Sequence, residues 1–346
     1  MYPWQRDQPN PSYGYPVLYQ EVAAHAAIRG VFFGAKWTDL EGDAIGSYDF
    51  SVIDTHLAEC RKLGRQLAVV LDFRTYGGDP AVPAYMRNDS ATYGGGVGTG
   101  TSKGGHFKTT TGYTPKFWVN SVRDRFIALV QALGTKYDRD PNFELIAIGE
   151  TSVGQGAGEY TPTAGDLDAY FANLLAIGAA TETAFPHTVR IQQVNHPHTI
   201  LAKFVPELLK NGIGMGGPDL FSSTVVGKAK DVPPGNENFG LAGAGRAYTY
   251  YSNFAGKLPL GTASMTDSWT RNGPHQNPDA NGPPAPLSAL FEFARDSLQL
   301  NYIFWLRYIT EVNGINRYKS ELLPLLDSLA VHGPAGGLHS AYPSLY

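Results

Sequence analysis

The sequence predicts an α/β protein built as one (β/α)8 barrel, the TIM-barrel architecture. Helix-like and strand-like segments alternate along the chain, and the strand-like segments are continuous apolar runs typical of buried parallel strands. With 346 residues the chain is long for one domain, but closed barrels reach this size around one core. No break in composition marks a second domain, so residues 1–346 are predicted to form a single barrel.

The first half of the chain alternates three predicted helices with three predicted strands. Apolar residues recur at helical spacing in residues 16–28, 49–64 and 115–134. Pro115 lies near the expected start of the third helix, and Gly134 lies at its expected end. The strand-like runs are GVFFGAKW (30–37), QLAVVLDF (66–73) and FELIAIGE (143–150). Each strand follows a helix, as expected of a parallel sheet.

The second half repeats this order. Helices are expected at 165–180, 199–210, 239–255 and 286–299, and strands at 189–195, 213–217, 258–265 and 302–309. Seven strands are counted in this way, so the eighth strand of a closed barrel must be the short N-terminal segment MYPWQ.

Two features qualify this architecture. A doubly wound open sheet is the rival, but the first strand-to-helix turn lacks the glycine fingerprint of a dinucleotide site. Residues 77–114 form a long Gly- and Thr-rich loop after the third strand. A flexible lid over a cleft and a tolerated surface insertion are both consistent with this loop.

Composition limits the classes of partner and location. The formal net charge of −4 argues against nucleic acid and anionic membrane surfaces, whereas 12% aromatic residues can line a cleft for a neutral, polar ligand. No transmembrane run or signal peptide is found in this sequence. A secreted or periplasmic location is nevertheless expected, with a cytoplasmic location left open. The one cysteine, Cys60, is expected to be a small buried hydrophobe. Oligomeric state is left open.

Polar and aromatic residues follow the predicted strands, where the functional residues of such barrels gather. A carbohydrate-cleaving site needs two carboxyl groups, together with amides, aromatic rings and arginine to hold sugar hydroxyls and ring faces. The residues at these strand ends are Trp37, Asp39, Glu41, Asp72, Arg74, Tyr76, Glu150, Gln193, Asn195, His196, Asp219, Ser264, Asp267, Trp269, Trp305 and Arg307.

Glu150 is the strongest catalytic candidate. It emerges from the apolar run LIAIG, and an apolar neighbourhood favours the protonated form that a general acid needs. A structural carboxylate that caps the following turn or pairs with arginine is the alternative. The rim tryptophans Trp37, Trp269 and Trp305 are each candidates either for the core or for stacking on a pyranose face.

Two long stretches resemble clan A glycoside hydrolases, in particular β-galactosidase-like and cellulase-like barrels. The first is WTDLEGDAIGSYDFSVIDTHLAECRKLGRQLAVVLDF, and the second is FWVNSVRDRFIALVQALGTKYDRDPNFELIAIGE. The likeness covers roughly residues 30–155 and rests on the combination rather than on a single diagnostic motif. It implies that FELIAIGE is the fourth barrel strand and that Glu150 is the general acid/base.

The resemblance also has departures. The family places Asn before the acid/base, whereas this chain has Gly149, so Asn195 or Gln193 is expected to supply the amide contact to a sugar 2-hydroxyl. The family nucleophile is a Glu that ends strand seven, where this chain offers Asp267 as the nearest carboxylate. The family's strand-eight Trp corresponds to Trp305. Asp219, Asp72 and Glu41 compete with Asp267 for the second carboxylate, and both retention and inversion stay open.

The sequence therefore predicts a glycosidase that cleaves a polysaccharide or oligosaccharide, with a β-linked glycan favoured. Glu150 and Asp267 are the catalytic candidates, and the substrate-binding candidates are Trp37, Asp72, Arg74, Tyr76, Asn195, His196, Asp219, Trp269 and Trp305. No cofactor and no metal are implied.

Three rival functions remain. A glycan-binding barrel without activity fits the missing Asn and the missing strand-seven Glu. A metal-dependent amidohydrolase fits His196-Pro-His198, although that pair follows a middle strand rather than the first one. A serine nucleophile is disfavoured, because no G-x-S-x-G elbow is present.

Overall fold

The computed structural model describes residues 1–4, 14–94, 104–154, 156–157, 160–221, 247–270, 284–307 and 314–339. Within this part of the chain, eight parallel strands close into a barrel in the order β1-β11-β10-β9-β8-β7-β3-β2. The strands are β1 (Tyr2–Trp4), β2 (Gly30–Lys36), β3 (Gln66–Asp72), β7 (Phe143–Ile148), β8 (Val189–Gln193), β9 (Gly214–Gly217), β10 (Leu260–Ser264) and β11 (Tyr302–Leu306). The predicted (β/α)8 barrel is confirmed, and MYPWQ does supply its first strand.

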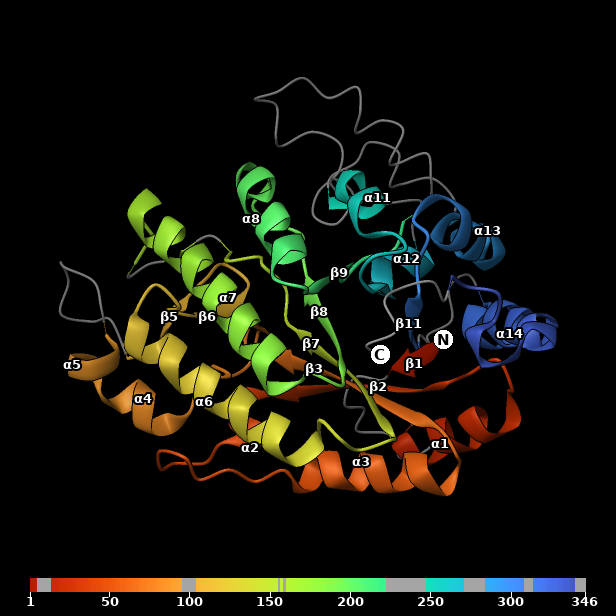
Figure 1. The fold of residues 1–346 in the computed structure, drawn as a ribbon, viewed down its shortest axis with the longest axis horizontal. Helices are drawn as coiled ribbons and strands as arrows, with labels where there is room; N and C mark the ends of the chain where they lie inside the picture. The colour runs from red at the N-terminus through yellow and green to blue at the C-terminus, as the bar shows by residue number, and fades with distance from the viewer. Residues whose placement is uncertain are drawn as a thin grey trace.

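Helices cover the outside of the strands (Figure 1). In the described part of the chain, seven α-helices lie within or overlap the predicted ranges: α1 (Tyr15–Ala24), α3 (Ser51–Lys62), α6 (Asn120–Tyr137), α7 (Ala164–Ala184), α8 (His198–Lys210), α11 (Tyr251–Phe254) and α13 (Leu287–Glu292). The helix α14 (Leu323–Leu329), after the last strand, was not predicted. Shorter helices α2 (Trp37–Leu40) and α12 (Thr266–Thr270) directly follow β2 and β10. Among the described residues, no helix combines the length and apolar character needed to cross a membrane.

The predicted third helix begins later than expected. Pro115 ends strand β6 (Gly112–Pro115) rather than opening a helix, because it pairs with His106 of β5 (His106–Lys108). The helix α6 starts at Asn120. The fixed φ of proline suits the last residue of a strand as well as a first helical turn, so Pro115 alone did not distinguish a strand end from a helix start.

Residues 77–114 contain regular structure in their described part. Helices α4 (Ala84–Asn88) and α5 (Ser90–Tyr93) come first, and β5 and β6 then join β4 (Thr75–Tyr76) in a three-stranded antiparallel sheet. The Thr114 hydroxyl donates to the Val153 carbonyl oxygen at 2.8 Å, which holds this sheet against the connection after β7. The Gly-rich residues 95–103 lie outside the described part of the chain.

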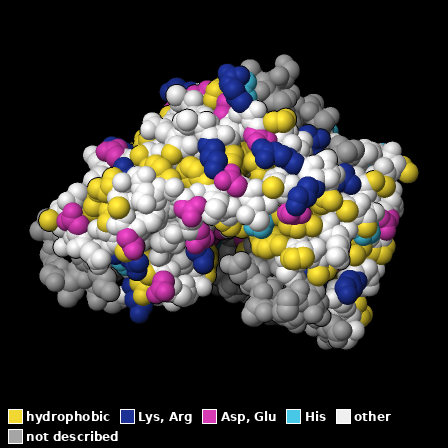
Figure 2. All heavy atoms as spheres, turned by 90° about the horizontal axis from the view of Figure 1, so that it is seen from below, with side chains coloured by type: hydrophobic (Ala, Val, Ile, Leu, Met, Phe, Trp, Pro, Cys, Tyr) yellow, Lys and Arg dark blue, Asp and Glu magenta, His cyan; other side chains and the backbone are white. Residues whose placement is uncertain are grey.

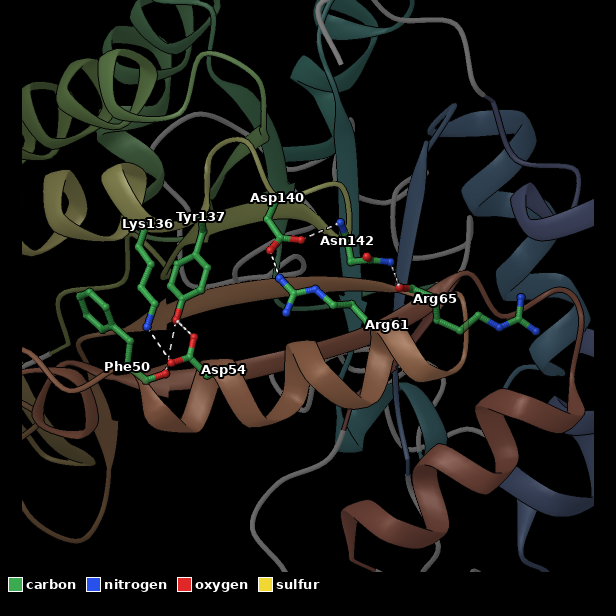
Figure 3. Close-up of polar contacts among 8 residues, drawn as sticks. All are labelled: Phe50, Asp54, Arg61, Arg65, Lys136, Tyr137, Asp140 and Asn142. Carbon is green, nitrogen blue, oxygen red and sulfur yellow. Dashed lines mark hydrogen bonds and ion pairs between the residues drawn. The ribbon is translucent and has the colours of Figure 1, made fainter.

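Polar contacts join α3 to α6 and to the turn before β7 (Figure 3). Asp54 accepts hydrogen bonds from Lys136 at 2.6 Å and from the Tyr137 hydroxyl at 2.8 Å. Arg61 forms an ion pair with Asp140. These contacts hold together the two helices that flank β3, the strand that carries Asp72.

The barrel strands are packed between two apolar layers, one inside the barrel and one between the strands and the helices. The inner layer fills the barrel and consists of Tyr2, Phe32, Ala68, Val70, Leu145, Ala147, Val189, Ile191, Ala263, Tyr302 and Phe304. The outer layer packs the strands against the helices. Because successive side chains on a strand alternate between these layers, the inner residues define which positions point to the barrel axis.

Candidate functional site

A cavity of about 410 Å³ lies at the carboxyl ends of the barrel strands. Side chains at the ends of β2, β3, β8 and β10 line it, together with the β4 segment and the residues that follow β7. The lining residues are Tyr15, Phe32, Gly34, Lys36, Asp39, Val70, Asp72, Phe73, Arg74, Thr75, Tyr76, Gly77, Gly78, Asp79, Gly149, Glu150, Gln193, Pro218, Ala263 and Met265. This is the end of the barrel where active sites of the fold are found.

Small residues on the inner face keep this end of the barrel open. Gly34, Gly149 and Ala263 all line the cavity. A Cβ atom at Gly34 would come within 2.8 Å of Asp72 Oδ2, and one at Gly149 would come within 2.8 Å of the Leu71 carbonyl oxygen. A side chain at position 34 would therefore occupy the space of the Asp72 carboxylate, and one at position 149 would collide with the backbone of β3.

Glu150 lies in this cavity, directly after β7, and each of its two carboxylate oxygens accepts a hydrogen bond. The Tyr76 hydroxyl donates to Oε1, and the Asn195 amide donates to Oε2. A phenol can donate to an ionised carboxylate and can also accept from a protonated one. The contact with Tyr76 is therefore compatible with both protonation states of Glu150.

The amide of Asn195 has a single consistent orientation. Its Oδ1 accepts from the backbone N–H of His196 at 2.7 Å, and the Thr151 hydroxyl lies 3.3 Å from the same oxygen. A backbone N–H can only donate, so Oδ1 must face it, and the amide NH2 group is left to donate to Glu150. The Asn195 amide therefore positions Glu150, whereas its expected contact with a sugar hydroxyl stays a prediction.

Arg74 and Tyr76 form one wall of the cavity. The Arg74 guanidinium donates to the Ser152 carbonyl oxygen at 3.0 Å and lies over the Tyr76 ring at 4.4 Å. The Tyr76 side chain is 59% exposed, although its hydroxyl end points to Glu150. Burial of that end, followed by the negative charge of Glu150, raises the pKa of Tyr76. Tyr76 is therefore a neutral hydrogen-bond donor at neutral pH.

His196 is close enough to the cavity for its charge to respond to the site. Burial lowers the pKa of His196, the Glu150 carboxylate opposes this effect, and Arg74 adds to it. The side chain of His198 lies outside the described part of the structure. Among the residues whose side chains are described, no group of three or more His, Cys, Asp or Glu is arranged to hold a metal ion.

The competing carboxylates have different surroundings. Asp72 lines the cavity together with Glu150. Asp219 follows the cavity residue Pro218, and its charge contributes to the raised pKa of Tyr76. Asp267 lies in α12, but its side chain is outside the described part of the structure. Glu41 is 1% exposed and accepts from Arg125 at 2.6 Å, so it is a structural carboxylate rather than a reacting one.

The three rim tryptophans do not line the cavity, which corrects the expectation that they stack on a ligand. Trp37, Trp269 and Trp305 are at most 1% exposed and belong to the outer apolar layer. On β11 the inward positions are Tyr302 and Phe304, so Trp305 points to the helices. Tyr76 is the exposed aromatic residue at the cavity instead.

Sequence reasoning did not identify Lys36 as a site residue. Lys36 follows Phe32 and Gly34 at a spacing of two along β2 and lines the same cavity. This spacing was present in the sequence, but GVFFGAK is apolar on both faces up to Lys36, so the pattern did not tell which face is the inner one.

The comparisons with known proteins support the fold. No family model and no curated protein matches the chain. The catalytic domain of β-amylase from Paenibacillus polymyxa is 10% identical with a TM-score of 0.53, and the match covers 93% of this chain and 97% of that one. The β-galactosidase from Rahnella sp. R3 is 14% identical with a TM-score of 0.58, over 97% of this chain and 57% of that one.

A further solved structure has the same barrel. The β-galactosidase from the haloarchaeon Halorubrum lacusprofundi is 11% identical with a TM-score of 0.54, over 88% of this chain and 52% of that one. This chain therefore spans little more than half the length of the two β-galactosidases. At these identities the likeness concerns the fold, and at that level the resemblance to glycoside-hydrolase barrels is confirmed.

Proposed function

We propose that this chain is a glycoside hydrolase that cleaves a β-linked polysaccharide or oligosaccharide at the carboxyl ends of its barrel strands. Glu150 acts as the general acid/base, and a second carboxylate acts on the anomeric carbon or on water. The observation that carries the proposal is Glu150 itself, held between Tyr76 and Asn195 in a cavity that also contains Asp72.

The described contacts suit the general acid/base role. Such a group must give a proton to the leaving oxygen and later take one from water. The Asn195 amide leaves Oε1 of Glu150 as the oxygen that can carry the proton, and Tyr76 can accept from that proton or donate in its absence. Arg74, Tyr76, Asn195, His196 and Asp219 are the candidates for holding sugar hydroxyls.

A barrel that binds glycans without cleaving them is the second candidate, and one observation favours it. Met265 lines the cavity just after β10, the seventh strand, where related enzymes are expected to carry a glutamate. Under this alternative, glycans bind but no sugar is released, and the Glu150→Gln substitution leaves binding unchanged.

A product profile with a panel of plant, microbial and algal glycans tests the proposal. Released sugars are measured by chromatography and mass spectrometry for the wild type and for Glu150→Gln. We expect release from at least one glycan, and turnover lower by about 10²–10⁴-fold in Glu150→Gln, because a positioned proton donor contributes that much.

Glu207→Gln is the matched control, because Glu207 is a half-exposed helix residue paired with Lys210. It should retain wild-type turnover. Equal turnover of Glu150→Gln and wild type would remove Glu150 from the reaction. Glycan binding with no product from any member of the panel would favour the binding-only barrel.

A further inference from the structure

We infer that Arg74 and Tyr76 are positioning residues for Glu150: Arg74 holds the Tyr76 ring, and the Tyr76 hydroxyl fixes the orientation of the Glu150 carboxylate. This inference rests on the proposed function, because it concerns the group that supplies the proton. It gives the two residues a role in place of the sugar contacts that the sequence predicts for them. The small sheet of β4, β5 and β6 thereby becomes part of the site.

The Glu150 carboxylate is held by donors from two separate parts of the fold. The Asn195 amide, which follows β8, donates to Oε2, and the Tyr76 hydroxyl, on β4, donates to Oε1. The last torsion of a glutamate side chain has a broad energy profile, so one donor alone leaves the carboxylate free to turn. Two donors, one on each oxygen, fix its plane. Without the Tyr76 hydroxyl, Oε1 loses its fixed direction.

The Tyr76 ring is held in turn by the guanidinium of Arg74. Arg74 Cζ lies 4.4 Å from the centre of this ring, within the range in which a cation is attracted to an aromatic face. The Tyr76 side chain is 59% exposed, so apolar packing alone does not fix it. The contact with Arg74 therefore contributes to the placement of the hydroxyl.

Neutral groups on two other segments hold the Arg74 guanidinium. Nη1 donates to the Ser152 carbonyl oxygen at 3.0 Å and to the Ser152 hydroxyl, and Nη2 donates to the Thr111 hydroxyl at 3.2 Å. Gly154 leaves room for this arrangement, because a Cβ atom there would come within 2.9 Å of Nη2. The guanidinium thus links the connection after β7 to the turn before β6.

These bonds leave Arg74 little capacity to hold a sugar. Both N–H groups of Nη1 donate to Ser152, one of Nη2 donates to Thr111, and Nε is buried without a hydrogen-bond partner. A buried Nε is out of reach of a ligand in the cavity. The described contacts of Arg74 suit a fixed support for the Tyr76 ring better than a sugar contact.

The position of Glu150 matters most when the leaving group is poor. The leaving oxygen keeps the electron pair of the broken C–O bond, and a poor leaving group must take the proton of Glu150 as the bond breaks. An acidic phenol leaves without that proton. A positioning residue for Glu150 therefore affects the rate in a way that depends on the leaving group, whereas a lost sugar contact lowers the rate for every leaving group.

Two aryl glycosides of the sugar that the product profile identifies test this inference on the full chain. The phenyl glycoside needs the proton and the 2,4-dinitrophenyl glycoside does not. The values compared are kcat/KM, which include the breaking of the glycosidic bond. Tyr76→Phe should lower kcat/KM by about 10–10²-fold on the phenyl glycoside and by less than about threefold on the dinitrophenyl glycoside, because a misplaced proton donor costs up to about 10²-fold.

Arg74→Gln should show the same dependence on the leaving group. The double variant of Tyr76→Phe and Arg74→Gln should lose no more than Tyr76→Phe alone, because Arg74 acts through Tyr76. Tyr113→Phe is the matched control, since Tyr113 lies on β6 of the same sheet but does not line the cavity. It should match the wild type on both glycosides. Melting curves check that each variant is folded.

Equal losses on both glycosides in folded variants would assign Tyr76 and Arg74 to the sugar, and wild-type kinetics of Tyr76→Phe would show that its hydroxyl is dispensable. Either result overturns this inference. Glu150→Gln separates it from the proposed function. A loss in Glu150→Gln on the phenyl glycoside, with wild-type kinetics of Tyr76→Phe, removes only this inference. Wild-type kinetics of Glu150→Gln, or a wild type that cleaves nothing, removes both.

Discussion

At the level of single residues, Glu150 owes its position to partners that are distant in sequence. Tyr76 lies on the small sheet after β3, and Asn195 follows β8. Each donates one hydrogen bond, and Asn195 is itself oriented by the His196 backbone and Thr151. A one-ångström shift of such a group can cost about a hundredfold in rate. Under the proposed acid/base role of Glu150, its partners are therefore expected to affect the rate even where they touch no substrate.

His196 predicts a pH dependence of stability. Burial lowers the pKa of His196, so the folded state binds the proton less well than the unfolded chain. The stability contributed by the neutral ring is fully present above the unfolded pKa of about 6.5, and it is lost as the pH falls below that value. Between pH 7 and pH 5, the melting temperature of His196→Gln should fall less than that of the wild type.

Thermal melts at half-unit pH intervals measure this difference. His332→Gln, at an exposed position, is the control and should follow the wild-type curve. Parallel curves for His196→Gln and wild type would mean that His196 does not contribute to the acid-induced loss of stability.

At the level of elements, α6 lies against the end of α7 at Gly134. A Cβ atom at Gly134 would lie 2.3 Å from the Ala184 carbonyl oxygen at the end of α7, and backbone cannot move aside as a flexible side chain can. The sequence suggested Gly134 as a helix end, but α6 continues to Tyr137. The glycine is required by helix packing and not by a turn.

The substitution Gly134→Ala should therefore destabilise the protein by about 1–3 kcal/mol, the usual cost of overpacking. Gly178→Ala is the matched comparison inside α7, since its Cβ atom would meet only Ile213 at an ordinary 3.7 Å. Because alanine is the better helix former, Gly178→Ala should be neutral or stabilising by up to about 1 kcal/mol. Urea unfolding compares the two, and equal effects of both substitutions would contradict the close contact.

At the level of the whole molecule, a polar cluster closes the end of the barrel opposite the cavity. Glu144 of β7 accepts from Arg29 at 2.6 and 2.8 Å and from the Tyr302 hydroxyl of β11 at 3.1 Å. The Tyr2 hydroxyl of β1 also donates to it. Burial, followed by the charge of Glu144, raises the pKa of Tyr2, which therefore stays neutral. One carboxylate thus connects strands from the beginning, middle and end of the chain.

Glu144→Ala should lower the free energy of unfolding by about 1–3 kcal/mol, because it leaves the buried tyrosine hydroxyls without their acceptor. Arg29 is 43% exposed and can return to water, so its lost ion pair adds little. Glu182→Ala, at an exposed position of α7, is the control. An unchanged unfolding midpoint for Glu144→Ala would show that the cluster does not stabilise the barrel.

Figure 2 shows how charged side chains are distributed on one face of the molecule. Lys and Arg side chains are interspersed with Asp and Glu on the face shown in Figure 2, so no large area of one sign is seen there. The net charge of −4 argues against nucleic acid, and this exclusion stays a prediction. A neutral glycan stays the predicted ligand.

The sequence alone determined the order and type of the barrel elements. Parallel strands that are buried on both faces appear in a sequence as continuous apolar runs, and the segments between them show the spacing of apolar residues that is typical of helices. It also placed Glu150 and Asn195 at strand ends, which meet at one end of any such barrel. Only the tertiary structure decided which side chains face the cavity. Where both faces of a strand are apolar, the sequence does not tell inner from outer, so Trp305 was expected at the site and Lys36 was not.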